Sequence, residues 1–168
     1  GFAVKWPLLF ETRNSLFVEV PRRLMHTFKS IFLDEGYMKG LGKKVPSNAT
    51  IIDIGANAGY FTVFTLLKFT SPSLLAYEPI PVNYAQLERH RDLNQAQNIK
   101  CFPVAISGHC GEIQLSFDAS DSFTTSATML SAGTNAPDSL NVKSITLQRI
   151  FEDNSFNKCD LLKIDCEG

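Results

Sequence analysis

The feature that most constrains this chain is a strand-like run that ends in a tight turn of small residues. Thr50 to Gly55 reads TIIDIG, which is typical of a strand buried on both faces. After the small residues Ala56 to Gly59, the stretch from Gly59 to Phe69 is apolar nearly all round and predicts a buried helix. A buried strand that enters a buried helix in this way indicates an α/β domain.

The same alternation continues downstream. Ser73 to Glu78 predicts a second strand, about Val82 to Asn94 a second helix, and about Asn98 to Ile106 a third strand. Strands and helices that alternate with short connections form right-handed βαβ units. We therefore expect a mostly parallel sheet.

The segments on either side of this unit are less uniform. Apolar residues at helical spacing after Pro21 predict an amphipathic helix that ends near Gly36. We interpret residues 1–46 as a helical lead-in that covers the site and residues 47–168 as the α/β domain. Beyond the third strand, Glu112 to Phe117 alternates apolar and polar residues and predicts a half-exposed strand.

Three predictions concern the last 50 residues or so. The Ser/Thr-rich segment from Ala119 to Asn141 is interpreted either as a lid that recognises the substrate or as a disordered surface loop. Val142 to Asp153 predicts a short strand that leads into a helix, with Thr146 as its N-cap. Asp160 to Asp165 predicts a final strand that ends in a carboxylate.

Composition excludes several classes of protein. The 16 basic and 17 acidic residues nearly cancel, so nothing favours nucleic acid or an anionic membrane as partner. The 4 cysteines stand singly and without a histidine cluster, which favours reduced thiols in a cytoplasmic protein and no metal site. No apolar run approaches the ~20 residues of a membrane span.

The strongest chemical pattern joins the first two predicted strands. Asp53 ends the first strand, and Gly55 and Gly59 remove side chains where the backbone approaches a ligand or packs closely. Asn57 tolerates left-handed backbone dihedrals. Glu78, at the end of the neighbouring strand, can accept both hydroxyls of a ribose. These parts predict a nucleoside site.

The turn also discriminates between nucleosides. The G-x-G-x-x-G pattern of dinucleotide sites needs a second glycine where this chain has Asn57, because the backbone there meets a pyrophosphate. S-adenosylmethionine has a ribose and an adenine but no phosphate. A nucleotide-dependent oxidoreductase and a non-catalytic binding module remain as alternatives.

Three strings, IIDIGANAGYFTVF, AYEPIPVNYAQLERHRDLN and CDLLKIDCEG, resemble the FkbM-type methyltransferase family, with IFLDEGYMKG as its lead-in. The resemblance implies a three-layer αβα, Rossmann-like fold and methyl transfer from S-adenosylmethionine, usually to a hydroxyl oxygen of a small molecule or saccharide. It also implies further C-terminal strands beyond Gly168, which we expect to be missing from this chain. The edge that they would leave open could support self-association.

The resemblance further implies a role for individual residues. The methionine part of the cofactor is expected to be surrounded by Asp53, Gly55, Ala56, Asn57 and Gly59. Glu78 is expected to hold the ribose with Pro79 beside it, and Ala105 to lie near the adenine. Asp165 and Glu167 are expected at the tip of the fourth strand, facing the transferred methyl group.

Proton transfer and the remaining aromatic groups complete the expectations. Either Asp165 or Glu167 is the candidate base, although a strand-tip aspartate can also cap the following turn. Among the histidines, His90 is expected to be solvated, His26 to be structural and His109 to lie nearest a ligand. Tyr37 is interpreted either as a cover of the cofactor or as a packing residue.

Overall fold

A central parallel sheet organises the protein. The computed structural model describes residues 5–39, 41, 44–117, 123, 127–129 and 138–166. The strands β3 (Thr50–Ile54), β4 (Ser73–Tyr77), β5 (Ile99–Phe102) and β10 (Leu161–Ile164) form this 4-stranded sheet in the order β10-β3-β4-β5. All three strand pairs are parallel, as the alternation of strands and helices predicted.

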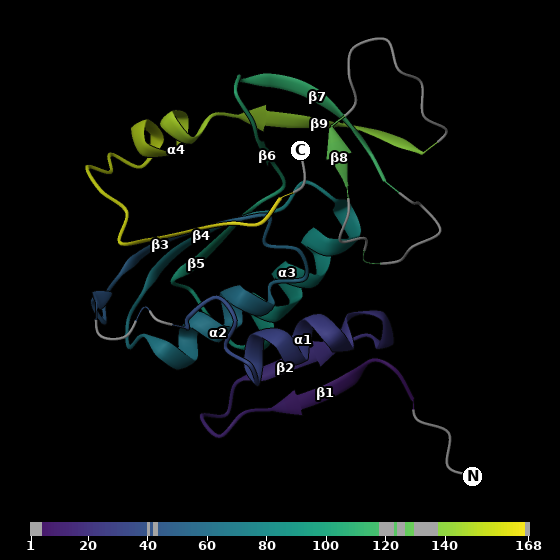
Figure 1. Ribbon diagram of the computed structural model, residues 1–168, viewed down its shortest axis with the longest axis vertical. Helices are drawn as coiled ribbons and strands as arrows, with labels where there is room; N and C mark the ends of the chain where they lie inside the picture. Colours follow the sequence, from purple (N-terminus) through teal and green to yellow (C-terminus); the bar gives the residue numbers. More distant parts are fainter. Residues whose placement is uncertain are drawn as a thin grey trace.

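Helices cover both faces of this sheet (Figure 1). One face is covered by α2 (Tyr60–Lys68) and α3 (Pro81–Leu93), with a 3-10 turn (Arg22–Leu24) and α1 (Met25–Phe32) packed outside α2. The other face is covered by α4 (Leu147–Asp153), whose Ile150 is fully buried against the sheet. The central strands β3 and β4 are buried on both faces, which explains their continuous apolar runs. Helices on both faces of the sheet confirm the three-layer α/β fold.

A second sheet lies beside the carboxyl ends of the central strands. Its strands are β6 (Ala105–Ile106), β7 (Gly111–Ser116), β8 (Thr128–Met129) and β9 (Ser139–Ile145), in the order β6-β9-β7-β8. The third predicted strand was wrong as one element, because β5 and β6 belong to different sheets. Pro103 stands between them and lacks the N–H that a continuous ladder needs.

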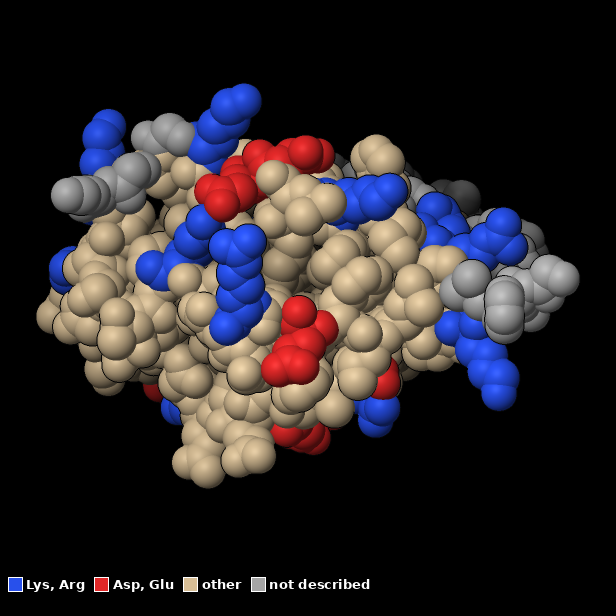
Figure 2. All heavy atoms as spheres, turned by 90° about the horizontal axis from the view of Figure 1, so that it is seen from below, with Lys and Arg blue, Asp and Glu red and all other residues tan. Residues whose placement is uncertain are grey.

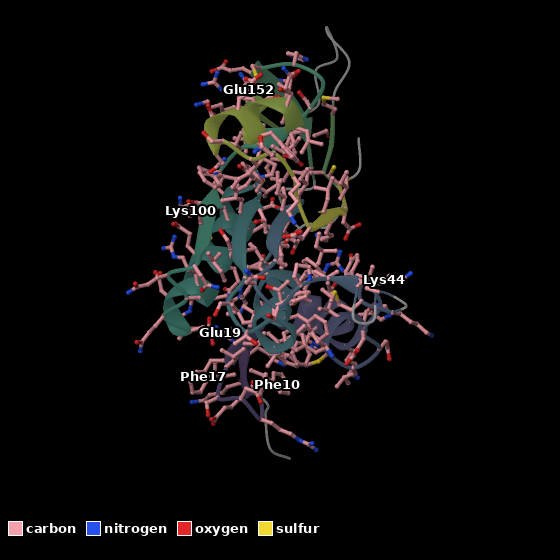
Figure 3. All side chains as sticks on the ribbon, turned by 90° about the vertical axis from the view of Figure 1, so that its left-hand side faces the viewer. Phe10, Phe17, Glu19, Lys44, Lys100 and Glu152 are labelled. Carbon is pink, nitrogen blue, oxygen red and sulfur yellow. The ribbon has the colours of Figure 1, made fainter. Side chains whose placement is uncertain are left out.

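An N-terminal hairpin, β1 (Leu8–Glu11) and β2 (Phe17–Val20), was not predicted from the sequence. Figure 3 shows Phe10, Phe17 and Glu19 on this hairpin, at the end of the molecule opposite Glu152 of α4. The hairpin is fastened to the end of α3, since the Phe17 N–H donates to Asn94 Oδ1 at 2.7 Å and Asn94 Nδ2 donates to the Phe17 carbonyl at 2.9 Å.

Two further expectations concern local features. The Thr146 hydroxyl accepts a hydrogen bond from the Arg149 N–H at 3.1 Å, which confirms Thr146 as the N-cap of α4. Figure 2 shows basic and acidic side chains interspersed on the face seen from below. In the described part of the chain, no helix is both long and apolar enough to cross a membrane.

Candidate functional site

The turn between β3 and α2 has a left-handed backbone conformation at three positions. Gly55, Asn57 and Gly59 have φ values of +71°, +51° and +83°. Asn57 is therefore left-handed, as its residue type predicted, and its Oδ1 accepts a hydrogen bond from the Ala58 N–H at 2.7 Å. The turn holds its shape through residues that tolerate this conformation.

Both glycines are also needed for close packing. A Cβ on Gly55 would lie 2.2 Å from the carbonyl oxygen of Asp165, so the ends of β3 and β10 meet backbone to backbone. A Cβ on Gly59 would lie 2.7 Å from Cδ1 of Leu87 on α3. The missing side chain of Gly55 thus lets the backbone of Asp165 approach the turn, whereas that of Gly59 lets α2 pack closely against α3.

Glu78 ties the turn to the end of β4. Its Oε2 accepts a hydrogen bond from the Asn57 N–H at 2.8 Å and its Oε1 accepts one from the Ile80 N–H at 2.9 Å. The residue is 4% exposed, and burial raises the pKa of Glu78 while these backbone hydrogen bonds act in the opposite direction. The carboxylate is held rigidly, with its orientation fixed from both sides.

Asp53 was expected to contact the cofactor, and the structure places its side chain fully buried among protein groups. Lys163 Nζ lies 2.9 Å from Asp53 Oδ1, and the Thr62 hydroxyl donates to Oδ2 at 2.7 Å. Lys163 also donates to the Gly55 carbonyl at 2.7 Å. The buried ion pair therefore joins β3 to β10 and supports the turn from behind.

Tyr37 covers the end of β10. Its hydroxyl donates a hydrogen bond to Asp165 Oδ2, and its ring meets Phe61 edge-on at 5.4 Å between centroids. Burial, followed by the contact with Asp165, raises the pKa of Tyr37, so the hydroxyl stays a donor. The Asp165 side chain is 57% exposed. These contacts agree with Tyr37 as a packing residue, and it also lines the cavity described next. Its role as a cover of the cofactor stays a prediction.

A cavity of about 410 Å³ lies at the carboxyl ends of β3, β4 and β10, between α1 and the second sheet. The predicted site residues that line it are Gly55, Asn57, Glu78, Pro79, Ala105 and Asp165. The residues Asp53, Ala56 and Gly59 lie outside its wall. Glu167 falls outside the described residues. The first and fourth predicted strands thus end at one site, as expected.

The three histidines occupy positions that differ from their predictions. His26, expected to be structural, lines the cavity, whereas His109 is exposed and is not part of its wall. His90 is fully buried rather than solvated. It bonds the Ala58 carbonyl through Nδ1 at 2.6 Å and accepts the Glu19 N–H through Nε2 at 2.9 Å. Burial lowers the pKa of His90, which favours this neutral ring.

Part of the cavity wall was missed in the sequence. The second sheet contributes apolar side chains from β6, β7 and β8, namely Ile106, Ile113, Leu115 and Met129. The alternation of Ile113 and Leu115 was a usable signal, because it marks the face of β7 that is turned inward. Ala127 and Met129, which belong to the segment interpreted as a lid or loop, also line the cavity.

The charge of the wall restricts the ligand. Glu78 and Asp165 contribute two carboxylates, and the described lining residues include neither lysine nor arginine. Such a wall repels a pyrophosphate and suits a neutral or cationic nucleoside. Together with the left-handed Asn57, it disfavours the dinucleotide alternative.

Comparison with known proteins identifies the family to which the chain is similar. The family model "Methyltransferase FkbM domain" matches residues 53–168. Methyltransferase sdnD of Sordaria araneosa is 35% identical over 91 residues, covering 54% of this chain and 34% of that protein. The 31-O-demethyl-FK506 methyltransferase FkbM of Streptomyces tacrolimicus is 30% identical over 94 residues, covering 54% and 34% respectively.

The fold agrees with a solved structure of the same family. The crystal structure of methyltransferase FkbM from Methylobacillus flagellatus KT matches with a TM-score of 0.50 and 14% identity, over 84% of this chain and 30% of that one. The chain spans about a third of the length of these curated relatives. Because the family model covers more than half of its residues, the chain belongs to the FkbM methyltransferase domain family.

Proposed function

We propose that this domain transfers a methyl group from S-adenosylmethionine to a hydroxyl oxygen of a small-molecule or saccharide acceptor. The observation that carries the proposal is the cavity where the turn at Gly55 and Asn57 meets the carboxylates of Glu78 and Asp165. Ligands of open α/β sheets bind beyond the carboxyl ends of the strands, which is where this cavity lies. Family membership supports the same activity.

The cavity suits this cofactor in size and chemistry. Its volume of about 410 Å³ is within the usual range of small-molecule sites. Its apolar side can receive an adenine, and its carboxylates suit ribose hydroxyls and a positively charged sulfur. When bound, the cofactor supplies an electrophilic methyl group.

The residues of the site bind the cofactor and act on the acceptor hydroxyl. Glu78 holds the ribose hydroxyls, and the glycine at position 55 lets the cofactor approach the backbone. Asp165 takes the proton of the acceptor hydroxyl or orients that hydroxyl. Since Tyr37 occupies Oδ2 of Asp165, Oδ1 is the oxygen that faces the acceptor. Glu167 remains a second candidate on the basis of the sequence alone.

Calorimetry tests cofactor choice. We expect the protein to bind S-adenosylmethionine and S-adenosylhomocysteine, and not NAD. Glu78→Gln should weaken both about tenfold or more, because a charged hydrogen-bond acceptor is lost. Glu112→Gln, on the exposed side of β7, is the matched control and should bind like the parent. Absence of binding to either sulfur nucleoside would refute the proposal.

The acceptor and the role of Asp165 need a separate measurement. The Streptomyces relative is a 31-O-demethyl-FK506 methyltransferase, which supports a hydroxyl acceptor here. Transfer of isotope-labelled methyl groups to hydroxyl-bearing small molecules and saccharides identifies the class. Asp165→Asn should then lower kcat about a hundredfold or more and change cofactor affinity little. Equal turnover would remove Asp165 from the reaction.

A further inference from the structure

We propose that the α1 polar face, formed by His26, Thr27 and Ser30, binds the carboxylate of the methionine part of the cofactor. The proposal rests on the proposed function and assigns one end of the cofactor to residues upstream of the segment matched by the family model, which begins at residue 53. All three residues line the cavity.

The two ends of the cavity differ chemically. The end formed by the second sheet is apolar, with Ile106, Ile113 and Leu115 on its wall. The side formed by α1 and the tip of β10 is mostly polar, because the α1 polar face and Tyr37 line it and Ile31 is the one apolar residue that α1 adds. Glu78, at the tip of β4, also lines the cavity.

In the proposal, the difference between the two sides of the cavity fixes the direction in which the cofactor lies. Its parts follow one another as adenine, ribose, sulfur and amino acid. Glu78 is suited to the ribose, and the flat adenine gains most from the apolar end. The amino-acid end must then point away from the second sheet, past Gly55 and Asn57 and toward α1.

The charges of the wall then single out α1. A bound carboxylate gains most from hydrogen-bond donors or a positive charge. Lys163 cannot serve, because its ammonium is held by Asp53 at 2.9 Å and by the Gly55 carbonyl at 2.7 Å. Among the described lining residues, His26 is the one side chain able to carry a positive charge, and Thr27 adds a hydroxyl donor.

The packing of α1 presents these groups on a rigid element. Phe28 is stacked between Phe10 of the hairpin and Phe32, with ring centroids 4.7 Å and 4.9 Å apart. Phe32 in turn meets Phe64 of α2 edge-on at 5.4 Å. One side of α1 is thereby fixed by aromatic contacts, and the α1 polar face is left for the cavity.

A pair of cofactors that differ by a single group tests the proposal. Calorimetry is carried out with S-adenosylmethionine and with decarboxylated S-adenosylmethionine. The parent should bind the carboxylated form about ten- to a hundredfold more tightly, which is the usual effect of a charged hydrogen bond. His26→Ala should abolish most of that preference and leave the affinity for the decarboxylated form unchanged.

Controls separate the two proposals. Lys29→Ala, on the same helix but outside the cavity wall, should keep the full preference. If His26→Ala keeps the preference, or loses affinity equally for both forms, the assignment of α1 is wrong while cofactor binding stands. If the parent binds neither form, the proposed function fails and this assignment fails with it. Circular dichroism of each variant verifies that it is folded.

Discussion

The ion pair between Lys163 and Asp53 should be a main structural support of the site. Lys163 Nζ lies 2.9 Å from Asp53 Oδ1, and the side chains of Lys163 and Asp53 are 7% and 0% exposed. Lys163 also donates a hydrogen bond to the Gly55 carbonyl. At an effective dielectric constant of about 20, the attraction at this distance is about 6 kcal/mol, much of it offset by desolvation. Lys163→Met keeps a similar volume but leaves Asp53 buried and charged. We expect the free energy of unfolding to fall by about 3–5 kcal/mol.

Chemical denaturation followed by circular dichroism measures this loss. Lys158→Met is a matched control, because Lys158 lies just before the same strand, also 2.9 Å from a carboxylate oxygen of Asp160, but is 78% exposed. It should unfold like the parent. Adding Asp53→Asn to Lys163→Met should restore part of the lost stability, since the unpaired charge is gone. A loss below about 1 kcal/mol in Lys163→Met would refute the structural role of the pair.

Two further predictions follow from the same region. Gly55→Ala should lower the free energy of unfolding by about 2–4 kcal/mol in the same assay, because of left-handed strain and the contact with the Asp165 carbonyl. Gly108→Ala is the control and should not lower it, because a Cβ at that position would have no atom within 4 Å. Equal stability of the two variants would contradict this reasoning. His90 has a lowered pKa, so its contribution is present above the ordinary value of 6.5 and is lost as the pH falls below it. Below pH 6.5, the free energy of unfolding of the parent should therefore fall more steeply with pH than that of His90→Asn, by up to about 1.4 kcal/mol per pH unit. If the two proteins show the same dependence of unfolding free energy on pH, this contribution of His90 is ruled out.

The central sheet could be predicted because its signals are local. Its strands are short apolar runs, and its first two helices follow within a few residues. The predicted bounds of β3, β4, β10, α2 and α3 therefore agree with the structure within one position, whereas the strand predicted from Asn98 ran on beyond the end of β5 at Phe102. The turn was predictable for the same reason, since Gly55 and Asn57 are residue types that tolerate positive φ. Local chemistry was enough for both.

Features that depend on distant partners could not be predicted. His90 is surrounded in sequence by charged residues, and its burial results from Glu19, 71 positions away, and Ala58, 32 positions away. The partners of Asp53 could not be predicted for a similar reason. A strand-end carboxylate suggests a ligand contact until Lys163, 110 residues later, is placed beside it. Spacing along the chain carries no information about such pairs.

The charge of the cavity wall explains why turnover should depend on Asp165 more than affinity does. In the proposed reaction, a carboxylate near a cationic sulfur would stabilise the bound cofactor at least as much as the transition state, where that charge is smaller. At 57% exposure, the attraction of Asp165 for that charge is also weakened by solvent. In the proposed reaction, its contribution to rate would therefore come from the acceptor side, through alignment and proton removal. Tyr37 donates to one oxygen of this carboxylate, and the proposal assigns the other oxygen to the acceptor hydroxyl.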